Sequence, residues 1–102
     1  VWVGDDDVLI GALKAWQESK RNDIKLIVGG GGGKQIVKKI LDGDPVVPLT
    51  VTYPPRMIAV GIDHAVAGAR KQPLTKEKRV VIPSEIVDKS NAAKFYFPDS
   101  AY

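Results

Sequence analysis

The sequence contains no cysteine and only one histidine, His64. A chain without cysteine forms no disulfide bonds and no thiolate metal sites, which is compatible with many compartments, the bacterial envelope among them. His64 has no second histidine as a partner, so we predict no metal centre. Because no serine or cysteine nucleophile stands beside a histidine, we also predict no catalytic site, and we do not expect an enzyme.

Long apolar runs and a strong charge excess are missing as well. No segment approaches the ~20 apolar residues of a membrane-spanning helix, while 44% of the residues are apolar and 26% are charged, as in soluble globular proteins. The net charge of +3 is spread over the chain, and the densest basic cluster, residues 76–79, includes Glu77. Nucleic-acid binding needs positive charge gathered on one surface, so we predict no nucleic-acid partner.

The 102 residues fit one small soluble domain with a single hydrophobic core. The sequence starts at Val1 without a methionine, and no signal peptide is recognisable. We therefore expect a processed or excised piece of a longer protein.

Apolar residues recur at helical spacing in three segments. Asp6 or Asp7 is the expected cap of the first helix, because a carboxylate there accepts hydrogen bonds from free N–H groups and meets the positive end of the helix dipole. Gly43 is expected to end the second helix, since glycine tolerates a positive φ. Pro55 would preset the first turn of the third helix. The three segments are residues 8–21, 34–43 and about 56–70.

The segments between and after these helices have the composition of strands. The apolar run that precedes the glycines is typical of a strand covered on both faces. Pro48 would remove one hydrogen bond from its strand, which indicates an edge or a strand start. Ser90 is expected to cap a single helical turn, and Trp2 and Trp16 are expected to pack in the core. The predicted strands are residues 1–3, 24–28, 46–52, 79–82 and 85–87.

Strands that alternate with helices predict β-α-β units, in which the first three strands are parallel and the helices cover the faces of the sheet. We therefore predict an α/β fold with three layers, α/β/α, around a mostly parallel sheet. Folds of this kind bind their ligands at the carboxyl ends of the strands. Three loops are expected at that edge, namely residues 4–7, 29–33 and 52–54.

Five consecutive glycines, residues 29–33, form one of these loops. A P-loop would need a glycine in place of Val28 and a hydroxyl residue in place of Gln35, and the dinucleotide fingerprint would need its third glycine where Lys34 or Gln35 stands. A nucleotide cofactor is therefore not expected. A flexible linker is disfavoured because a strand and a helix enclose the glycines without spare residues. Backbone that lacks side chains can come close to a ligand.

Several motifs follow one another in a characteristic order. VGDDD precedes a helix with IGAL, LIVGGG precedes a helix closed by ILDGD, a strand runs into TVTYPP, and the chain ends in FYFPDSAY. Together they resemble the carboxyl-terminal part of the sugar-binding proteins of ABC importers, the ribose-binding-like type I periplasmic binding proteins. The resemblance covers essentially the whole chain. It implies an incomplete flavodoxin-like lobe, with residues 1–53 in the second lobe, 54–78 as the helix after the hinge and 79–102 as terminal strands and tail.

Members of this family hold a sugar between two lobes that close around it, and they deliver it to a membrane permease. The resemblance therefore implies a sugar- or sugar-alcohol-binding subunit of an ABC transport system, in the periplasm or on the outer face of the bacterial cell membrane. It also implies that an amino-terminal lobe is missing. The surface that would normally face that lobe is then exposed, which predicts possible self-association. The alternative is the effector-sensing domain of a lactose-repressor-type transcription regulator, which shares the fold.

The resemblance implies ligand-binding positions as well. Asp5 matches a family Asn or Asp at a strand end and could accept two hydroxyl hydrogen bonds, while Tyr53 offers a phenol and a ring face. Gly31 replaces an aspartate of many relatives, so the ligand is either bulkier than ribose or held by N–H groups from Gly30 to Gly32. We predict Asp5, Gly30, Gly31 and Tyr53 as ligand-binding residues, with no cofactor and no metal. Helix capping by Asp5 and shielding of the hinge by Tyr53 are the competing interpretations.

Overall fold

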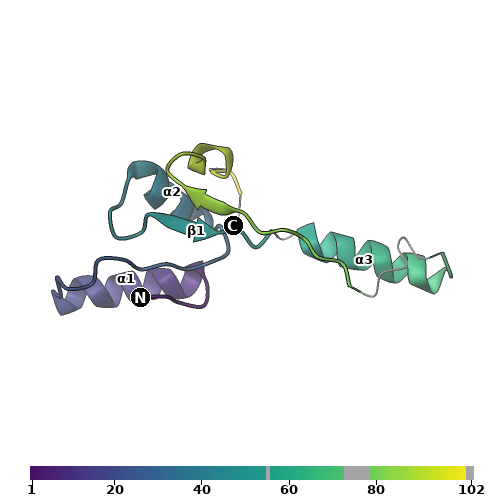
Figure 1. The fold of residues 1–102 in the computed structure, drawn as a ribbon, viewed down its shortest axis with the longest axis horizontal. Helices are drawn as coiled ribbons and strands as arrows, with labels where there is room; N and C mark the ends of the chain where they lie inside the picture. The colour runs from purple at the N-terminus through teal and green to yellow at the C-terminus, as the bar shows by residue number, and fades with distance from the viewer. Residues whose placement is uncertain (55, 73–78, 101–102) are drawn as a thin grey trace. The chain divides into compact units, whose positions relative to one another are not determined.

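The computed structural model describes residues 1–54, 56–72 and 79–100, and Figure 1 shows its elements. The chain divides into two compact units. Unit 1 comprises Val1–Tyr53 and Glu85–Tyr102, and unit 2 comprises Pro54–Ser84. Within the described part of the chain, no helix has the length and apolar character required to traverse a bilayer.

Helix α1, Asp6–Ser19, begins two residues before the predicted segment 8–21. Asp5 is the N-cap, because its backbone is extended and its Oδ1 accepts a hydrogen bond from the N–H of Val8 at 2.8 Å. The prediction that Asp6 or Asp7 caps this helix is therefore wrong. Asp6 lies in the first helical turn and its side chain is buried, while Asp7 stays exposed.

The other two helices agree with their predicted spacing. Helix α2, Lys34–Asp42, ends at Gly43, whose φ of 82° is the left-handed conformation expected there. Helix α3, Arg56–Ala69, lies in unit 2 and buries only Ala67 among its described residues. The predicted role of Pro55 falls outside the described residues.

The three leading strands run parallel, as predicted, but they are short. The first pairs with the second at a bridge between Trp2 and Val28, and the second pairs with the third at a bridge between Gly31 and Thr52. Only the third segment contains a regular strand, β1, Leu49–Val51, which begins just after Pro48 as expected of a strand start.

Strand β2, Ile86–Asp88, pairs antiparallel with β1 and places Val87 opposite Thr50. A strand was expected at 85–87, and β2 is shifted from it by one residue. The strand predicted at 79–82 is wrong, because those residues, which are described, form no strand. The short 3-10 helix η1, Ala92–Lys94, follows Asn91, which makes no capping bond through its side chain.

Four predictions about individual positions in unit 1 need correction. The segment 24–28 is not covered on both faces, because Ile27 is buried while its neighbour Leu26 is 43% exposed. Trp2 is 77% exposed, because side chains alternate along a strand and Val3 is the one that packs against the core. Trp16 is half-buried at the margin of the core. Ser90 caps no helix, since its N–H and hydroxyl donate to the carboxylate of Asp88.

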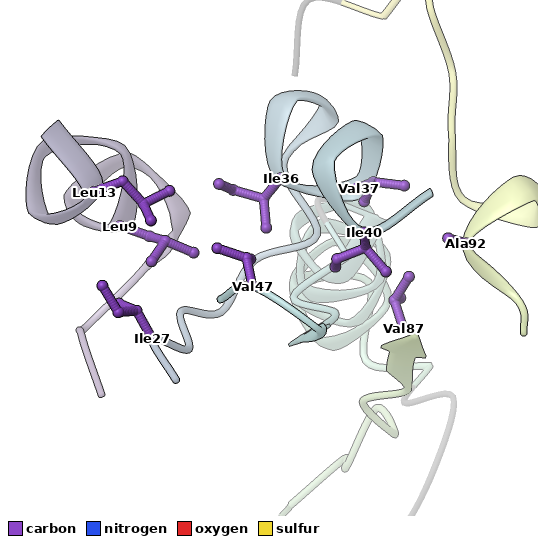
Figure 2. Packing of buried hydrophobic residues seen from close by; sticks show 9 residues of the cluster. All are labelled: Leu9, Leu13, Ile27, Ile36, Val37, Ile40, Val47, Val87 and Ala92. Carbon is purple, nitrogen blue, oxygen red and sulfur yellow. The ribbon is translucent and has the colours of Figure 1, made fainter. Parts of the chain in front are cut away.

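One cluster of buried apolar side chains holds unit 1 together (Figure 2). It joins α1 and α2 to the strand segments, and α2 also packs against β1, β2 and η1. Full burial of one such side chain stabilises a fold by about 1.5–3 kcal/mol. The cluster consists of Leu9, Leu13, Ile27, Ile36, Val37, Ile40, Val47, Val87 and Ala92.

Candidate functional site

The carboxyl ends of the three parallel segments meet at one edge of unit 1. The backbone N–H of Asp6, directly after Asp5, donates to the carbonyl oxygen of Gly30 at 2.8 Å. The N–H of Tyr53 donates to the carbonyl oxygen of Gly31 at 3.0 Å. The structure therefore brings the four predicted ligand-binding residues, Asp5, Gly30, Gly31 and Tyr53, to the same edge, and their contact with a ligand stays a prediction.

Two of these residues present polar side chains to solvent. Asp5 is exposed, and helix capping occupies only its Oδ1. Within the described ranges its Oδ2 has no hydrogen-bond partner, so this oxygen can accept a bond from a hydroxyl group. Tyr53 is 66% exposed, which leaves its ring available for packing. Capping and ligand binding are therefore compatible roles for Asp5.

The glycine loop, residues 29–33, binds an anion that belongs to the protein itself. The carboxylate of Asp6 is buried, and its Oδ2 accepts hydrogen bonds from the N–H groups of Gly32 at 2.9 Å and Gly33 at 2.7 Å. The hydroxyl of Thr50, also buried, donates to Oδ1 at 3.0 Å. One carboxylate thus ties the start of α1 to the glycine loop and to β1.

Three glycines of the loop are required by this arrangement. A Cβ on Gly29 would lie 2.6 Å from Oδ1 of Asp6, closer than real atoms approach. Gly31 and Gly32 have φ values of 132° and 82°, which side-chain-bearing residues rarely adopt. Gly30 differs, because the nearest atom to its added Cβ would be a carbonyl oxygen 3.8 Å away. The run of glycines is therefore explained largely by the enclosed Asp6 carboxylate.

The amide groups of the loop are less available to a ligand than predicted. The N–H of Gly31 donates to the carbonyl oxygen of Val51 at 2.7 Å, and that of Gly32 donates to Asp6. Among the described residues, the N–H of Gly30 has no acceptor. The expectation that Gly30 to Gly32 all offer N–H groups to a ligand is therefore wrong for two of the three, and Gly30 is the residue that can still do so.

Burial raises the pKa of the Asp6 carboxyl above its ordinary value of 3.8. Hydrogen bonds from Gly33, Thr50 and Gly32 act in the opposite direction, and the nearby charge of Asp5 adds a smaller upward contribution. Asp6 lies in the first turn of α1 and against the N-terminus of α2, where both helix dipoles favour a negative charge. The desolvation of the carboxylate outweighs these stabilising contacts.

The raised pKa predicts how Asp6→Asn changes the pH dependence of stability. A carboxyl whose folded pKa exceeds its unfolded pKa contributes stability that is present below the unfolded value and is lost as the pH rises through the folded pKa. The wild type should therefore gain stability relative to Asp6→Asn as the pH falls from 7 towards 4. Urea unfolding of both proteins at several pH values measures this difference.

Asp23 provides a control of opposite sign. Its hydrogen bond from the Nε of Arg21, at 2.9 Å, lowers its pKa to about 2. The wild type should therefore lose stability relative to Asp23→Asn as the pH falls through 4 towards 2. A difference for Asp6→Asn with the same sign as that for Asp23→Asn would contradict the assignment of a raised pKa.

Lys34, which follows the glycines, anchors the carboxyl-terminal tail. Its ammonium group donates to the carbonyl oxygen of Pro98 at 3.2 Å and to that of Ser100. Residues 95–100 of the tail are therefore connected to the start of α2, beside the glycine loop. This gives Lys34 a structural role in place of the phosphate-binding role of a P-loop lysine.

A separate groove of about 390 Å³ lies beside the C-terminal end of α2, away from the carboxyl edge. None of the predicted ligand-binding residues lines it. Within the described part of the chain, no group of three or more histidine, aspartate or glutamate side chains could hold a metal ion. The residues that line the groove are Trp16, Lys39, Asp42, Gly43, Asp44, Pro45 and Val46.

Comparison with solved structures decides the fold. A galactofuranose-binding protein matches 94% of this chain with 23% identity and a TM-score of 0.75. A solute-binding protein of an ABC transporter from Mycobacterium smegmatis, solved with bound glycerol, matches 92% with 30% identity and a TM-score of 0.78. The binding protein of the arabinose ABC transporter from Shewanella sp. ANA-3, bound to α- and β-L-arabinofuranose, matches 94% with 28% identity and a TM-score of 0.73.

The chain has the α/β fold of the type I periplasmic binding proteins, in incomplete form, and resembles their sugar-binding members. It spans 32% of the length of each of these three proteins. The resemblance and the α/β fold class expected from the sequence are thereby confirmed. No family model matches the chain, and no curated protein matches it. Two of these neighbours are binding proteins of ABC transporters, and the third is named for binding galactofuranose.

The sequence did not reveal the pair formed by Asp6 and Thr50. Three aspartates in a row before a helix favour capping for each of them, and nothing in their spacing singles out the middle one. Thr50 is a hydroxyl residue within the apolar strand segment VVPLTVT, which is the one signal that a buried polar partner was needed. The assignment of residues 1–53, 54–78 and 79–102 to parts of a two-lobe protein stays a prediction.

Proposed function

We propose that this chain forms part of the sugar- or polyol-binding receptor of an ABC importer, and that its carboxyl edge supplies one wall of the ligand site. The observation that carries the proposal is the meeting of Asp5, Gly30, Gly31 and Tyr53 at that edge. The solved neighbours that share this fold bind arabinofuranose, galactofuranose or glycerol, which supports a polyhydroxylated ligand.

Each residue at the edge suits such a ligand in a different way. The free Oδ2 of Asp5 would accept a hydrogen bond from a sugar hydroxyl, and a charged acceptor of this kind contributes about 1.5–3 kcal/mol. The exposed ring of Tyr53 would pack against the apolar face of a sugar, and its hydroxyl can donate or accept. Gly30 would let the ligand approach the backbone and use its free N–H.

The role is binding rather than catalysis, and it needs more than this chain. We propose a second, amino-terminal lobe that closes over the ligand and a membrane permease that receives it, with the receptor in the periplasm or at the outer face of the membrane. One wall alone leaves half of a ligand in water, so its affinity should be weak. This 102-residue chain, which spans 32% of its neighbours' length, is therefore expected to bind sugars weakly or not at all.

Isothermal titration calorimetry with L-arabinose, D-galactose and glycerol tests the proposal. The product of the complete reading frame of the source gene should bind one of these ligands with a micromolar Kd, while the 102-residue chain should give little heat. Tyr53→Ala should weaken binding by the longer protein about tenfold, which corresponds to about 1.4 kcal/mol.

Phe97→Ala is the matched control, because Phe97 is also an exposed aromatic residue, at 61% compared with 66% for Tyr53. Its substitution should leave the Kd unchanged. Failure of the longer protein to bind any of the three ligands would contradict the proposed ligand class. Micromolar affinity of the 102-residue chain alone would instead contradict the need for a second lobe.

A further inference from the structure

Asp6 holds the glycine loop at three of its residues. Its backbone N–H donates to the carbonyl oxygen of Gly30 at 2.8 Å, and its carboxylate accepts from Gly32 at 2.9 Å and Gly33 at 2.7 Å. Gly31, between them, is bonded to the third strand segment through both its N–H and its carbonyl oxygen. Every glycine from 30 to 33 is therefore fixed by at least one hydrogen bond, and Asp6 provides three of them.

We propose that Asp6 is a positioning residue of the ligand site, whose carboxylate holds the glycine loop in the shape that presents Gly30 to a ligand at the carboxyl edge. This inference rests on the proposed sugar-binding function. Asp6 itself is 3% exposed and enclosed by the loop, so it acts through the glycines and does not touch the ligand.

The chemistry of the contact argues against a role in stability alone. A buried carboxylate must give up its hydration, and burial is the largest influence on Asp6, raising its pKa. A neutral side chain of the same shape could fill this space without that penalty. A charged acceptor, however, binds two backbone N–H groups about twice as strongly as a neutral one does. The arrangement therefore favours a rigid loop over a maximally stable interior.

The surroundings of Asp6 contain few charges that could take over this role. Asp5, at the start of α1, is the nearby charged group that affects Asp6, and the repulsion between them favours protonation of Asp6. Lys34, which follows the loop, directs its ammonium group to carbonyl oxygens of the tail. Thr50 on β1 is neutral and donates its hydroxyl hydrogen to Asp6. No cation among the described residues forms an ion pair with Asp6.

Amide NMR on the ¹⁵N-labelled chain directly tests the hydrogen bonds between the Asp6 carboxylate and the glycine loop. The N–H signals of Gly32 and Gly33 should shift together as the pH is lowered, with one midpoint above 3.8, because both donate to the same titrating carboxylate. Asp6→Asn should abolish this shared titration. Asp7→Asn, which neutralises the exposed neighbour of Asp6, should leave it unchanged. Independent or absent titration of the two signals in the wild type would overturn the proposal.

Sugar binding by the longer protein tests the positioning role, with L-arabinose, D-galactose and glycerol as probes. The wild type should bind more weakly as the pH falls through the midpoint measured for Gly32 and Gly33, whereas Asp6→Asn should bind about equally across this range. At pH 7, Asp6→Ala should weaken binding at least tenfold and Asp7→Ala should not. A merely structural role would not move the pH profile of affinity.

The outcomes separate this inference from the function on which it rests. A wild type that binds sugar with the same pH profile as Asp6→Asn would overturn the positioning role and leave the proposed function intact. A wild type that binds none of the three probes would overturn the proposed function and the ligand part of this inference, while the amide signals would still decide whether Asp6 holds the loop.

Discussion

Gly29→Ala is expected to lower the free energy of unfolding by about 3 kcal/mol, near the upper end of the range for an overpacked interior. The new methyl group would lie 2.6 Å from Oδ1 of Asp6, 3.0 Å from the backbone oxygen of Asp5 and 3.1 Å from Leu9. Movement of the helix start or of the buried carboxylate away from the methyl group would break hydrogen bonds and so cost free energy. Urea unfolding followed by circular dichroism measures the loss.

Gly30→Ala is the matched control, one residue along the same loop. Its methyl group would meet only the carbonyl oxygen of Val51 at 3.8 Å, an ordinary contact. Replacing glycine where the backbone tolerates alanine changes stability by roughly 0.4–1 kcal/mol in the favourable direction, because the unfolded chain loses freedom. Equal destabilisation by Gly29→Ala and Gly30→Ala would show that Asp6 is not packed against Gly29 as described.

Ile40→Ala is expected to lower the free energy of unfolding by about 2–5 kcal/mol, as other large-to-small changes in protein cores do. Ile40 is 1% exposed and lies in the apolar cluster of unit 1, where Figure 2 shows it among side chains of α2 and the strand segments. Its removal leaves a cavity that the surrounding helix and strands cannot fill completely. Chemical denaturation with urea measures the change.

Ile62→Ala separates burial from helix propensity, since it makes the same replacement within a helix. Ile62 is 57% exposed on α3, so the change removes little buried surface there, and alanine is the better helix former. We expect an effect within about 0.5 kcal/mol, the usual range for surface substitutions. A loss at Ile40 no larger than that at Ile62 would contradict the assigned core.

The helices could be predicted from sequence because local signals determine them. Gly43 ended α2 as expected, since a left-handed residue there has few alternatives to glycine. The strands were harder to predict, because the length of a strand depends on pairing with segments that are distant in the sequence. Trp2 and Leu26 were expected in the interior on the strength of their apolar side chains, yet alternation along the strand turns both towards solvent.

The sequence predicted that the candidate site lies at the carboxyl edge of the strands, but it did not predict the hydrogen bonds within the site. Parallel strands bring their carboxyl ends together, so Asp5, the glycines and Tyr53 could be placed at one edge from their positions after strands. The contact between Asp6 and Thr50 joins residues 44 positions apart, and no local pattern encodes it. Carboxylates are rarely buried, so the sequence favoured helix capping by Asp6 and gave no indication that its carboxylate is enclosed.

The return of the chain to unit 1 through β2 has a consequence for biosynthesis. β2 joins β1 only after the intervening unit 2 has been made, and closing a loop of roughly 30 residues costs about 3 kcal/mol in chain entropy. Val87 and Ala92 complete the apolar cluster. A nascent chain that has emerged only as far as α3 therefore leaves apolar surface of α2 exposed to solvent. Unit 1 therefore completes its folding only after β2 and Ala92 have emerged, and we expect a chaperone that shields α2 until then to raise its yield.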